Sequence, residues 1–384
     1  RAAAAPASRD GSALQLQQAE RVGWTYVNNH NLPEGRGVAS MCAGDFGIMV
    51  FGGEITEYDD VAETLLLDRP GGTWRTLEYD VHPSARALGA TARYRGGCLL
   101  YGGVGPGTQG YPVHNDTWFW TLEGGWVELT ATLDRAPRPV FYHTLCTMSN
   151  GELFMFGGRN ELNGNAVSST DDAWIYNEKG WTQLRWPHLP EGINQPSARW
   201  GHGMTCALSN TGPASVRGDH LPPGNIECVL FGGAQVGDDD FFDDTWLLRY
   251  ETNETADGGT PLTPRRYYWE QLNAQVRPHG RWCFQMATCG SRVVMTGGSV
   301  DYRVAADETW VWQPTIRSVE SSAASGHTGE WVRLYGTDAF YDEEPRRPGA
   351  GPRRINAMAM TNVGELAQSD IILFGGVNNA VGGN

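Results

Sequence analysis

The most regular feature of the chain is a run of four or five apolar residues that ends in two glycines. It occurs six times, with the glycine pairs at positions 52–53, 102–103, 157–158, 232–233, 297–298 and 375–376. Short apolar runs bounded by glycine are typical of buried β-strands. Their spacing predicts a repeated unit of about 50 residues, with insertions in the later copies.

Three further elements recur around each apolar run. A three-residue element, which we name the Asp-Thr-Trp element, follows the glycines. It consists of an acidic residue, then threonine or alanine, then tryptophan or leucine, and it ends at Leu65, Trp118, Trp174, Trp246 and Trp310. A lone tryptophan comes next, at Trp74, Trp126, Trp181, Trp269 and Trp331. An arginine precedes each run, at Arg36, Arg86, Arg138, Arg199, Arg281 and Arg354. This order predicts four short strands per unit, which we name a to d.

In this scheme strand a starts after the arginine, strand b ends in Gly-Gly, strand c starts at the Asp-Thr-Trp element and strand d carries the lone tryptophan. The glycine pairs indicate that strand b ends close to neighbouring backbone, where a Cβ would clash or φ must be positive. Asn150 and Gly151 predict a two-residue hairpin turn between strands a and b of the third unit. By that alignment Met148 pairs with Leu153, and Ala207 pairs with Cys228.

These elements resemble the kelch repeat family, in the double glycine, the Asp-x-Trp element and the spaced tryptophan. The six copies cover residues 21–384. The resemblance implies an all-β fold, a kelch-type β-propeller in which each unit is one four-stranded blade and the blades close around an axis. We predict six blades, with seven as the alternative.

The two ends of the chain add to this organisation. The segment from Trp24 to Val27 has the pattern of an isolated strand d, and we predict that it completes the last blade and so hides the sheet edges. The last unit stops at Asn384 before its own Asp-Thr-Trp element, so the natural protein is expected to continue. Residues 1–20 are predicted as an N-terminal linker with a short helix, which a capping box opens at Ser12.

Composition excludes some classes of partner. The chain has 384 residues, a formal net charge of −15, 50 glycines and 15 tryptophans. Such an acidic chain would repel a phosphate backbone, so no nucleic-acid partner is expected. The sequence has no apolar run of about 18 residues, so no membrane insertion is expected either. Residues 1–10 lack the pattern of a signal peptide.

The seven cysteines are predicted to be small buried residues. Cys42 and Cys146 share one repeat position, and Cys98 and Cys228 share another. The predicted register places Cys206 on the opposite face of its strand from Cys228, so no bridge between them is expected. The absence of a Cys-x-x-Cys pair argues against zinc. Reduced thiols would favour an intracellular, cytoplasmic location over an extracellular one.

Two short motifs favour the extracellular alternative. The sequon at Asn115 is part of the repeat itself, whereas the sequon at Asn253 lies in a long insertion between strands c and d. Arg217, Gly218 and Asp219 form an Arg-Gly-Asp tripeptide in the a–b insertion of the fourth unit. An extracellular adhesive module would require a glycan on Asn253.

The loops between strands b and c and between strands d and a emerge on one face of a propeller, and this face is the predicted partner-binding face. Its candidate residues are Tyr58, Asp59, Tyr111, Arg159, Trp186, Phe241, Phe242, Tyr302, Arg303 and Tyr341. Exposed aromatics mixed with charges are typical of interface hot spots. The acidic residues of this face form either a solvated surface or a docking site for a basic segment.

The six strand-a arginines have two interpretations. They could form a basic ring around the axis that holds an acidic peptide. Alternatively, each arginine could tie its own blade to backbone carbonyls. Both interpretations place them at the same face.

We therefore predict a non-enzymatic protein-binding scaffold, without a cofactor, that forms part of a larger assembly. The alternative is an enzyme at the propeller mouth, since galactose-oxidase-like proteins of this fold hold copper with tyrosines and histidines. Against it, the histidines here are scattered, and His143 and His202 occupy one repeat position, which indicates a packing role.

Overall fold

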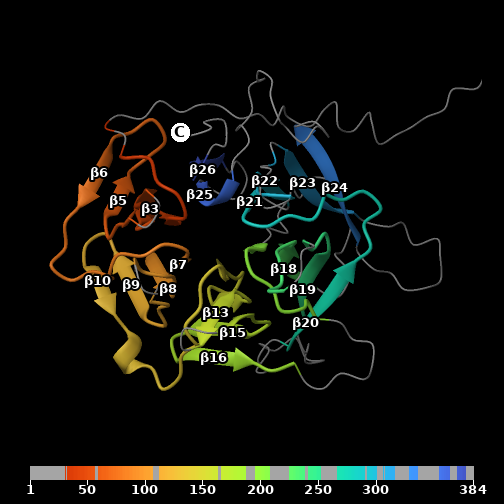
Figure 1. The fold of residues 1–384 in the computed structure, drawn as a ribbon, viewed down its shortest axis with the longest axis horizontal. Coiled ribbons are helices and arrows are strands. Elements are labelled where there is room, and N and C mark those ends of the chain that lie inside the picture. The colour runs from red at the N-terminus through yellow and green to blue at the C-terminus, as the bar shows by residue number, and fades with distance from the viewer. Residues whose placement is uncertain are drawn as a thin grey trace, which may run out of the picture.

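The computed structural model describes residues 31, 33–56, 59–106, 112–162, 166–186, 195–207, 225–237, 241–251, 266–289, 292–300, 306, 308–315, 328–335, 354–363 and 370–377. These residues form strands and one short 3-10 turn, Thr130–Thr132. Figure 1 shows the strands gathered into sheets that stand around a common centre. The predicted all-β propeller is confirmed.

Five sheets have four strands each, in the predicted order a-b-c-d. Blade 1 contains β1 (Ser40–Gly44), β2 (Gly47–Phe51), β5 (Thr64–Leu67) and β6 (Trp74–Leu77). Blade 2 contains β7 (Ala90–Tyr94), β8 (Gly97–Tyr101), β9 (Thr117–Thr121) and β10 (Gly125–Glu128). Blade 3 contains β11 (Thr144–Thr147), β12 (Leu153–Phe156), β15 (Ala173–Asn177) and β16 (Gly180–Leu184).

Blade 4 contains β17 (Gly203–Cys206), β18 (Asn225–Phe231), β19 (Thr245–Glu251) and β20 (Arg266–Leu272). Blade 5 contains β21 (Gln285–Cys289), β22 (Arg292–Thr296), β23 (Thr309–Thr315) and β24 (Thr328–Tyr335). A sixth, two-stranded sheet contains β25 (Arg354–Val363) and β26 (Asp370–Val377). The described residues thus form five complete blades, one fewer than predicted. The predicted closing strand at Trp24 lies outside them.

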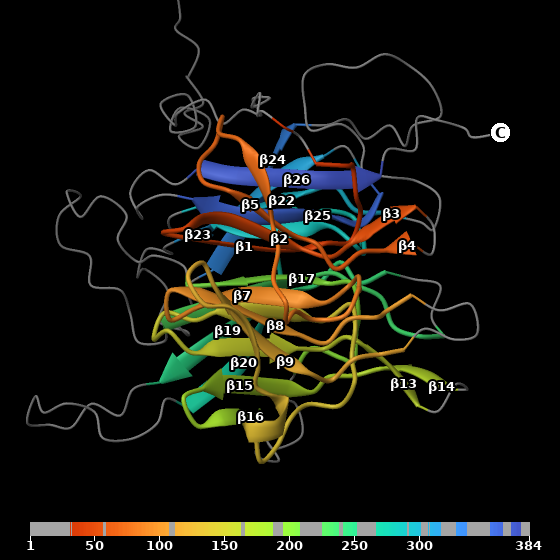
Figure 2. The ribbon, with the colours of Figure 1, turned by 90° about the vertical axis from the view of Figure 1, so that its left-hand side faces the viewer.

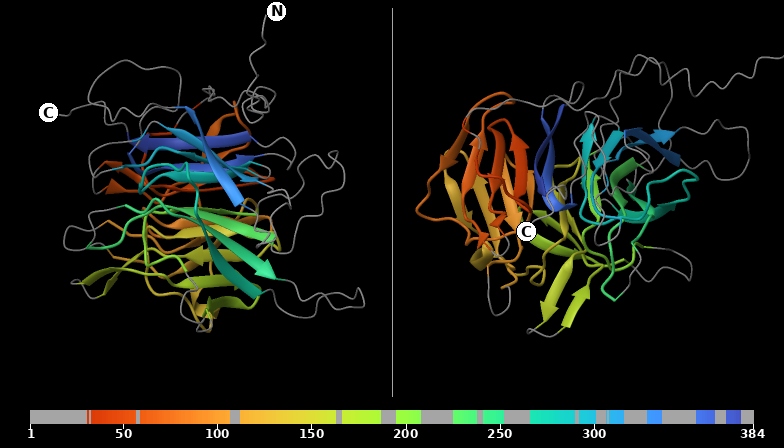
Figure 3. Two further views of the ribbon diagram at one scale, coloured as in Figure 1. Left: turned by 90° about the vertical axis from the view of Figure 1, so that its right-hand side faces the viewer. Right: turned by 45° about the horizontal axis from the view of Figure 1, so that its top comes forward.

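The innermost strands stand side by side around the axis. Strand β25 contacts both β21 and β1, so the sixth sheet lies between blade 5 and blade 1. Two small hairpins, β3 (Glu54–Thr56) with β4 (Asp59–Asp60) and β13 (Arg159–Leu162) with β14 (Ala166–Ser169), extend the b–c loops of blades 1 and 3. Figure 2 shows both hairpins projecting from the same side of the sheets, and Figure 3 shows the sheets from two further directions. This side is the b–c and d–a face.

The glycine pairs fulfil the predicted close approach. Gly52 has a φ of 68°, and a Cβ built on it would lie 2.4 Å from the carbonyl oxygen of Arg86 in the next blade. The next glycine, Gly53, donates its N–H to that same carbonyl at 2.9 Å. The pairs of blades 1 to 4 therefore each join their own blade to the following blade through backbone contacts that a side chain would block.

Tryptophans of strand d fill the spaces between blades and have a repeated hydrogen-bond partner. The indole N–H groups of Trp126, Trp181 and Trp331 donate to the hydroxyls of Thr64, Thr117 and Thr245 in the preceding blade, at 2.9–3.0 Å. Those threonines are the middle residues of the Asp-Thr-Trp elements. The element therefore supplies the acceptor that a buried indole needs.

Blade 3 breaks this rule, which gives a stability prediction. Ala173 stands where the other blades have threonine, and Trp269 of blade 4 packs in the same cluster. The Trp269 indole N–H is buried and has no acceptor among the described residues. Replacing Ala173→Thr should supply that acceptor and raise the free energy of unfolding by about 1 kcal/mol. Chemical denaturation measures this, with Thr117→Ala as a control that should lose about the same amount. If Ala173→Thr does not raise the free energy of unfolding while Thr117→Ala lowers it, the proposed role of this threonine position is wrong.

The cysteine pairing differs from the prediction. Cys206 stands directly opposite Cys228 in the β17–β18 register, and the two form a disulfide. In blade 3 Thr147, rather than Met148, pairs with Leu153, because the turn around Asn150 and Gly151 is one residue longer than assumed. A one-residue shift moves every side chain to the other face. A second disulfide joins Cys42 to Cys98, so the expectation of reduced thiols is wrong for these four residues.

Candidate functional site

Four of the six strand-a arginines are buried and donate to acceptors within their own blades. The exposed fractions of Arg36, Arg86, Arg199 and Arg281 are 4%, 2%, 0% and 0%. The Arg86 guanidinium donates to both carboxylate oxygens of Asp116 at 2.6 and 2.7 Å, and also to the Gly102 carbonyl and to Ser84. All five of its N–H donors are used.

The same geometry recurs in blades 1, 4 and 5. Arg199 donates to Asp244 and the Gly232 carbonyl, Arg36 to Glu63 and the Gly52 carbonyl, and Arg281 to Glu308 and the Gly297 carbonyl. The carboxylate also accepts the indole N–H two residues later, as Asp116 does from Trp118 at 2.7 Å. The acidic residue before threonine thus holds an arginine and a tryptophan together. These contacts agree with the interpretation in which each arginine ties its own blade to backbone carbonyls, rather than with a basic ring that holds an acidic peptide.

Blade 3 has no arginine at this position. Val140 occupies it, since the Val140 carbonyl accepts from Gly103 just as the Arg86 carbonyl accepts from Gly53. Arg138, two residues earlier, reaches Asp172 at 3.0 Å from outside, with half of its side chain exposed. The predicted alignment of Arg138 with the other arginines is therefore wrong.

A series of backbone hydrogen bonds links blades 1 to 5 around the axis at this face. Leu88 donates to Val38, Tyr142 to Leu88, Gly201 to Tyr142 and Cys283 to Gly201, at 2.7–3.2 Å. These five residues share one repeat position and have φ values of 50–62°. Such values are rare for valine, leucine, tyrosine and cysteine, and strained backbone of this kind is found where surrounding structure imposes it, often at functional sites.

Aromatic side chains occupy half of the mouth of the propeller. The residue that precedes each of the five hydrogen-bonded residues is Gly37 or Ala87 in blades 1 and 2 but Phe141, Trp200 or Trp282 in blades 3 to 5. The Tyr142 ring lies 5.1 Å from that of Trp200, and Phe241 stacks on Trp282 at 6.2 Å. Phe141, Tyr142 and Phe241 remain partly exposed. The mouth is therefore asymmetric, with small residues on one side and aromatic residues on the other.

Arg159 completes this aromatic side. Its guanidinium lies 5.0 Å from the Trp200 ring centre and 5.9 Å from that of Phe141. No carboxylate pairs with it among the residues that the structure describes, and its Nε is enclosed without an acceptor. The Trp200 indole N–H also has no acceptor among them. We define the mouth surface as Phe141, Tyr142, Arg159, Val236 and Phe241.

Burial raises the pKa of Tyr142 well above its usual value, and its hydroxyl is hydrogen-bonded to the Cys283 thiol. This tyrosine–cysteine contact is the observation nearest to the copper-enzyme alternative. However, the described part of the chain contains no group of three histidines, cysteines or carboxylates that could hold a metal ion. Because its pKa is raised, Tyr142 is a neutral, largely apolar residue of the mouth at physiological pH.

The two repeat-related histidines pack between blades. His143 lies against Tyr101 with ring centres 5.8 Å apart, and His202 lies against Phe156 at 5.6 Å. Burial lowers the pKa of His143 to about 3 and that of His202 well below its usual value. Both imidazoles are neutral, and the two lie in different inter-blade spaces.

Blade 1 contributes acidic groups to the same face. Asp59 and Asp60 form β4, and Glu54 begins β3. The pKa of Asp60 is raised to about 6 by its partial burial and by the nearby carboxylates of Glu54 and Asp59.

Behind the mouth, a pocket of about 390 Å³ lies between the inner strands. Its lining includes small and hydroxyl-bearing residues such as Ser40, Thr91 and Thr205.

The structure brings together only part of the predicted site. Arg159 lies over Trp200, and Phe241 stacks on Trp282, which packs against Trp200. Phe242 lies 4.1 Å from the Arg199 guanidinium, and Trp186 packs against Trp269 away from the mouth. Tyr58, Tyr111, Tyr302, Arg303 and Tyr341 lie outside the described residues, and only the backbone of Arg354 is described. Phe141, Tyr142, Trp200 and Trp282 were missed. Comparing the residue after each strand-a arginine would have found Trp200 and Trp282, whereas Phe141 follows Val140 and was concealed by the alignment of Arg138.

Within the part of the chain that the structure describes, we find no helix with the length and apolarity of a membrane span. A comparison with curated proteins gives no match. A family model described as the KLHDC2/KLHL20/DRC7 Kelch-repeats domain matches residues 8–211. This match covers more than half of the chain, and it agrees with the blade order and the Gly-Gly contacts described above. The chain belongs to the Kelch-repeat family.

Proposed function

We propose that the protein is a non-enzymatic scaffold that holds a protein partner at its mouth surface. Kelch propellers commonly serve as protein-interaction modules. The observation that supports this site most directly is Arg159, whose guanidinium stacks on Trp200 without a carboxylate partner among the described residues. A partly buried arginine with an enclosed Nε, beside partly exposed aromatic rings, is the composition of an interface hot spot.

The chemistry of the mouth surface defines what it can hold. Arg159 can donate to a carboxylate or to backbone carbonyls of the partner, and an aromatic platform strengthens such contacts by excluding water. Phe141 and Phe241 offer partly exposed rings on either side. The buried arginines support the blades beneath this surface and are left out of it.

Affinity capture from native extract tests the proposal. Arg159→Ala should reduce capture of a stoichiometric partner by at least about tenfold, because truncating a hot-spot residue typically costs about 2 kcal/mol or more. Arg95→Ala is the matched control, since Arg95 is an exposed arginine in an a–b turn on the opposite face, paired with Glu178. Equal capture by Arg159→Ala and wild type, with loss in Arg95→Ala, would place the site elsewhere. Copper in the purified protein without any captured partner would favour the enzyme alternative.

The compartment forms part of the proposal. The intracellular expectation rested on reduced thiols, and the disulfides Cys42–Cys98 and Cys206–Cys228 remove that support. Disulfides form and persist mainly in oxidising compartments. We propose that the protein folds in such a compartment. Asn253, whose glycosylation would support an extracellular adhesive role, lies outside the described residues.

A further inference from the structure

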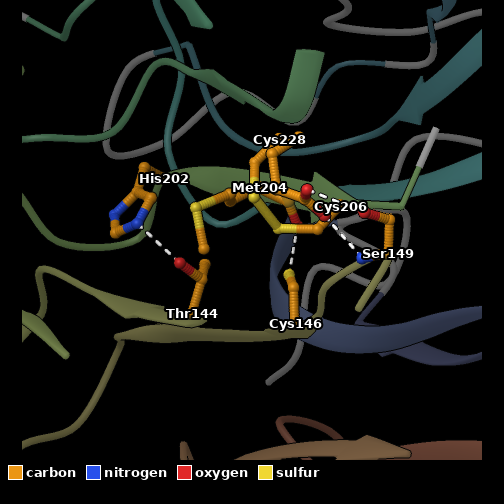
Figure 4. Close-up of a disulfide and its surroundings, with 8 residues drawn as sticks. Thr144, Cys146, Ser149, His202, Met204, Cys206 and Cys228 are labelled. Atoms are coloured by element: carbon orange, nitrogen blue, oxygen red, sulfur yellow. Dashed lines mark hydrogen bonds between the residues drawn. A yellow bond between two sulfur atoms is a disulfide. The ribbon is translucent and has the colours of Figure 1, made fainter. Parts of the chain in front are cut away.

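Three cysteines meet in the space between blades 3 and 4. Cys206 and Cys228 form the disulfide within blade 4, and Cys146 extends from β11 of blade 3 toward them, as Figure 4 shows. The Cys146 thiol donates to the Met204 carbonyl at 3.2 Å and packs against the cluster that contains both bonded cysteines. Cys146 is a free thiol.

The first two blades show which bridge this geometry permits. Cys42 of β1 is bonded to Cys98 of β8 in the next blade, with Cα atoms 6.2 Å apart. Cys146 follows Val140 at the same distance in sequence as Cys42 follows Arg36, and Cys228 precedes its glycine pair as Cys98 does. Cys146 and Cys228 are therefore the repeat equivalents of a pair that does form an inter-blade disulfide.

The two interfaces differ in the residue that stands opposite the strand-b cysteine. Arg93 stands opposite Cys98 in the β7–β8 register, whereas Cys206 stands opposite Cys228 in the β17–β18 register. Residues directly opposite one another in an antiparallel pair point to the same face. Cys98 therefore has Cys42 as its bonded partner, whereas Cys228 has Cys206 opposite it and Cys146 at the repeat position that Cys42 holds relative to Cys98.

We infer that Cys146, Cys206 and Cys228 form a thiol–disulfide exchange site that can move the disulfide from within blade 4 to the blade 3–blade 4 interface. The Cys146 thiolate attacks the Sγ of Cys228, the Cys206–Cys228 bond breaks, and Cys206 leaves as a thiolate that takes up a proton. One disulfide is lost and one is formed, so the step requires no oxidant.

The exchange would change what the disulfide holds. Cys206–Cys228 closes the a–b connection of blade 4, with a sequence separation of 22. Cys146–Cys228 would instead fasten blade 3 to blade 4, as Cys42–Cys98 fastens blade 1 to blade 2, and would release the a–b connection. Burial raises the pKa of Cys146 to about 12, so the thiolate forms rarely while the interface is closed. Exchange is therefore expected when the two blades separate slightly.

Counting free thiols in unfolded, alkylated protein tests the inference. Wild type should show three, Cys146, Cys283 and Cys289. In Cys206→Ser, oxidative folding should join Cys146 to Cys228, which leaves only Cys283 and Cys289 free. Cys42→Ser is the matched control, because Cys98 has no second cysteine near it and should remain free beside Cys146, Cys283 and Cys289. Free Cys146 and Cys228 in folded Cys206→Ser would overturn the inference.

Peptide mapping of wild type provides a second measurement that does not depend on the folding of a variant. Incubation with a glutathione redox buffer should yield a Cys146–Cys228 linked peptide, which must be absent in Cys146→Ser. The incubation is repeated in urea at a concentration that loosens the fold. If the digest then contains only the Cys206–Cys228 linked peptide, the exchange does not occur. A linked Cys42–Cys98 peptide in the same digests confirms that disulfides were preserved.

Discussion

Replacing Arg199→Ala is expected to lower the free energy of unfolding by about 3–5 kcal/mol. The side chain is fully buried, and its donors satisfy Asp244, the Gly232 carbonyl and Ser197. Removing it leaves a largely buried carboxylate and a buried carbonyl without their partner. Such loss of one partner costs far more than the pair contributes relative to an apolar substitute. Urea denaturation followed by tryptophan fluorescence measures the change.

Arg138→Ala is the matched control for this effect. Arg138 also pairs with a strand-c aspartate, but about half of its side chain is exposed. Water can replace this half-exposed guanidinium beside Asp172, so its removal should cost only about 0–1 kcal/mol. Similar losses in Arg138→Ala and Arg199→Ala would show that burial does not distinguish the two arginines. A fully stable Arg199→Ala would remove the structural role that we assign to the strand-a arginines.

Trp331→Ala is the second substitution with a large expected effect, about 3–5 kcal/mol. The indole is 2% exposed, lies 5.3 Å from the Phe231 ring of the preceding blade and donates to the Thr245 hydroxyl at 2.9 Å. Truncation opens a cavity between blades 4 and 5 and orphans the buried hydroxyl. The midpoint of thermal unfolding should fall accordingly.

Trp331→Phe separates the two contributions. It keeps most of the apolar contact but loses the indole donor, so it should cost about 1–2 kcal/mol. Thr245→Val removes the acceptor, and the double variant should be less destabilised than the sum of the two single variants. Additive effects would mean that the Trp331–Thr245 hydrogen bond carries no coupling energy.

The repeat architecture could be predicted from the sequence because its causes are local. The glycine pairs occur where a Cβ would meet the backbone of the next blade, as it would at Gly52. The acidic residue of the Asp-Thr-Trp element holds an arginine and an indole together, as Asp116 does for Arg86 and Trp118. These signals also predicted the strand order a to d, which is confirmed. The predicted complete sixth blade is not seen, because the described residues of the last sheet form only β25 and β26.

Register was the point where sequence reasoning failed. The predicted register rests on the blade 3 turn, which is one residue longer than assumed, and the same error carried over to blade 4 placed Cys206 on the wrong face. Cys206 stands opposite Cys228 and is bonded to it. In blade 3 an arginine near the expected place, Arg138, concealed that Val140 occupies the structural position. Spacing in a single chain does not resolve one residue, whereas hydrogen-bond partners do.

The candidate site was predicted in part. Arg159 and Phe241 were selected because charged and aromatic residues on b–c loops are typical of interfaces, and both lie at the mouth. The position of Tyr142 at the mouth was missed, because a positive φ at a tyrosine has no sequence signal. The role of the buried arginines depended on their depth in the blade, which the repeat pattern alone does not give.

Hydrogen exchange of the protein with and without its captured partner tests the mouth surface most directly. We expect slower exchange of backbone amides around Phe141 and Tyr142, at Arg159 and around Phe241 when the partner is bound, with no change in the a–b turn at Arg95 and Gly96. Protection confined to the a–b and c–d turns, with the mouth unchanged, would show that the partner binds the opposite face and would contradict the proposed function.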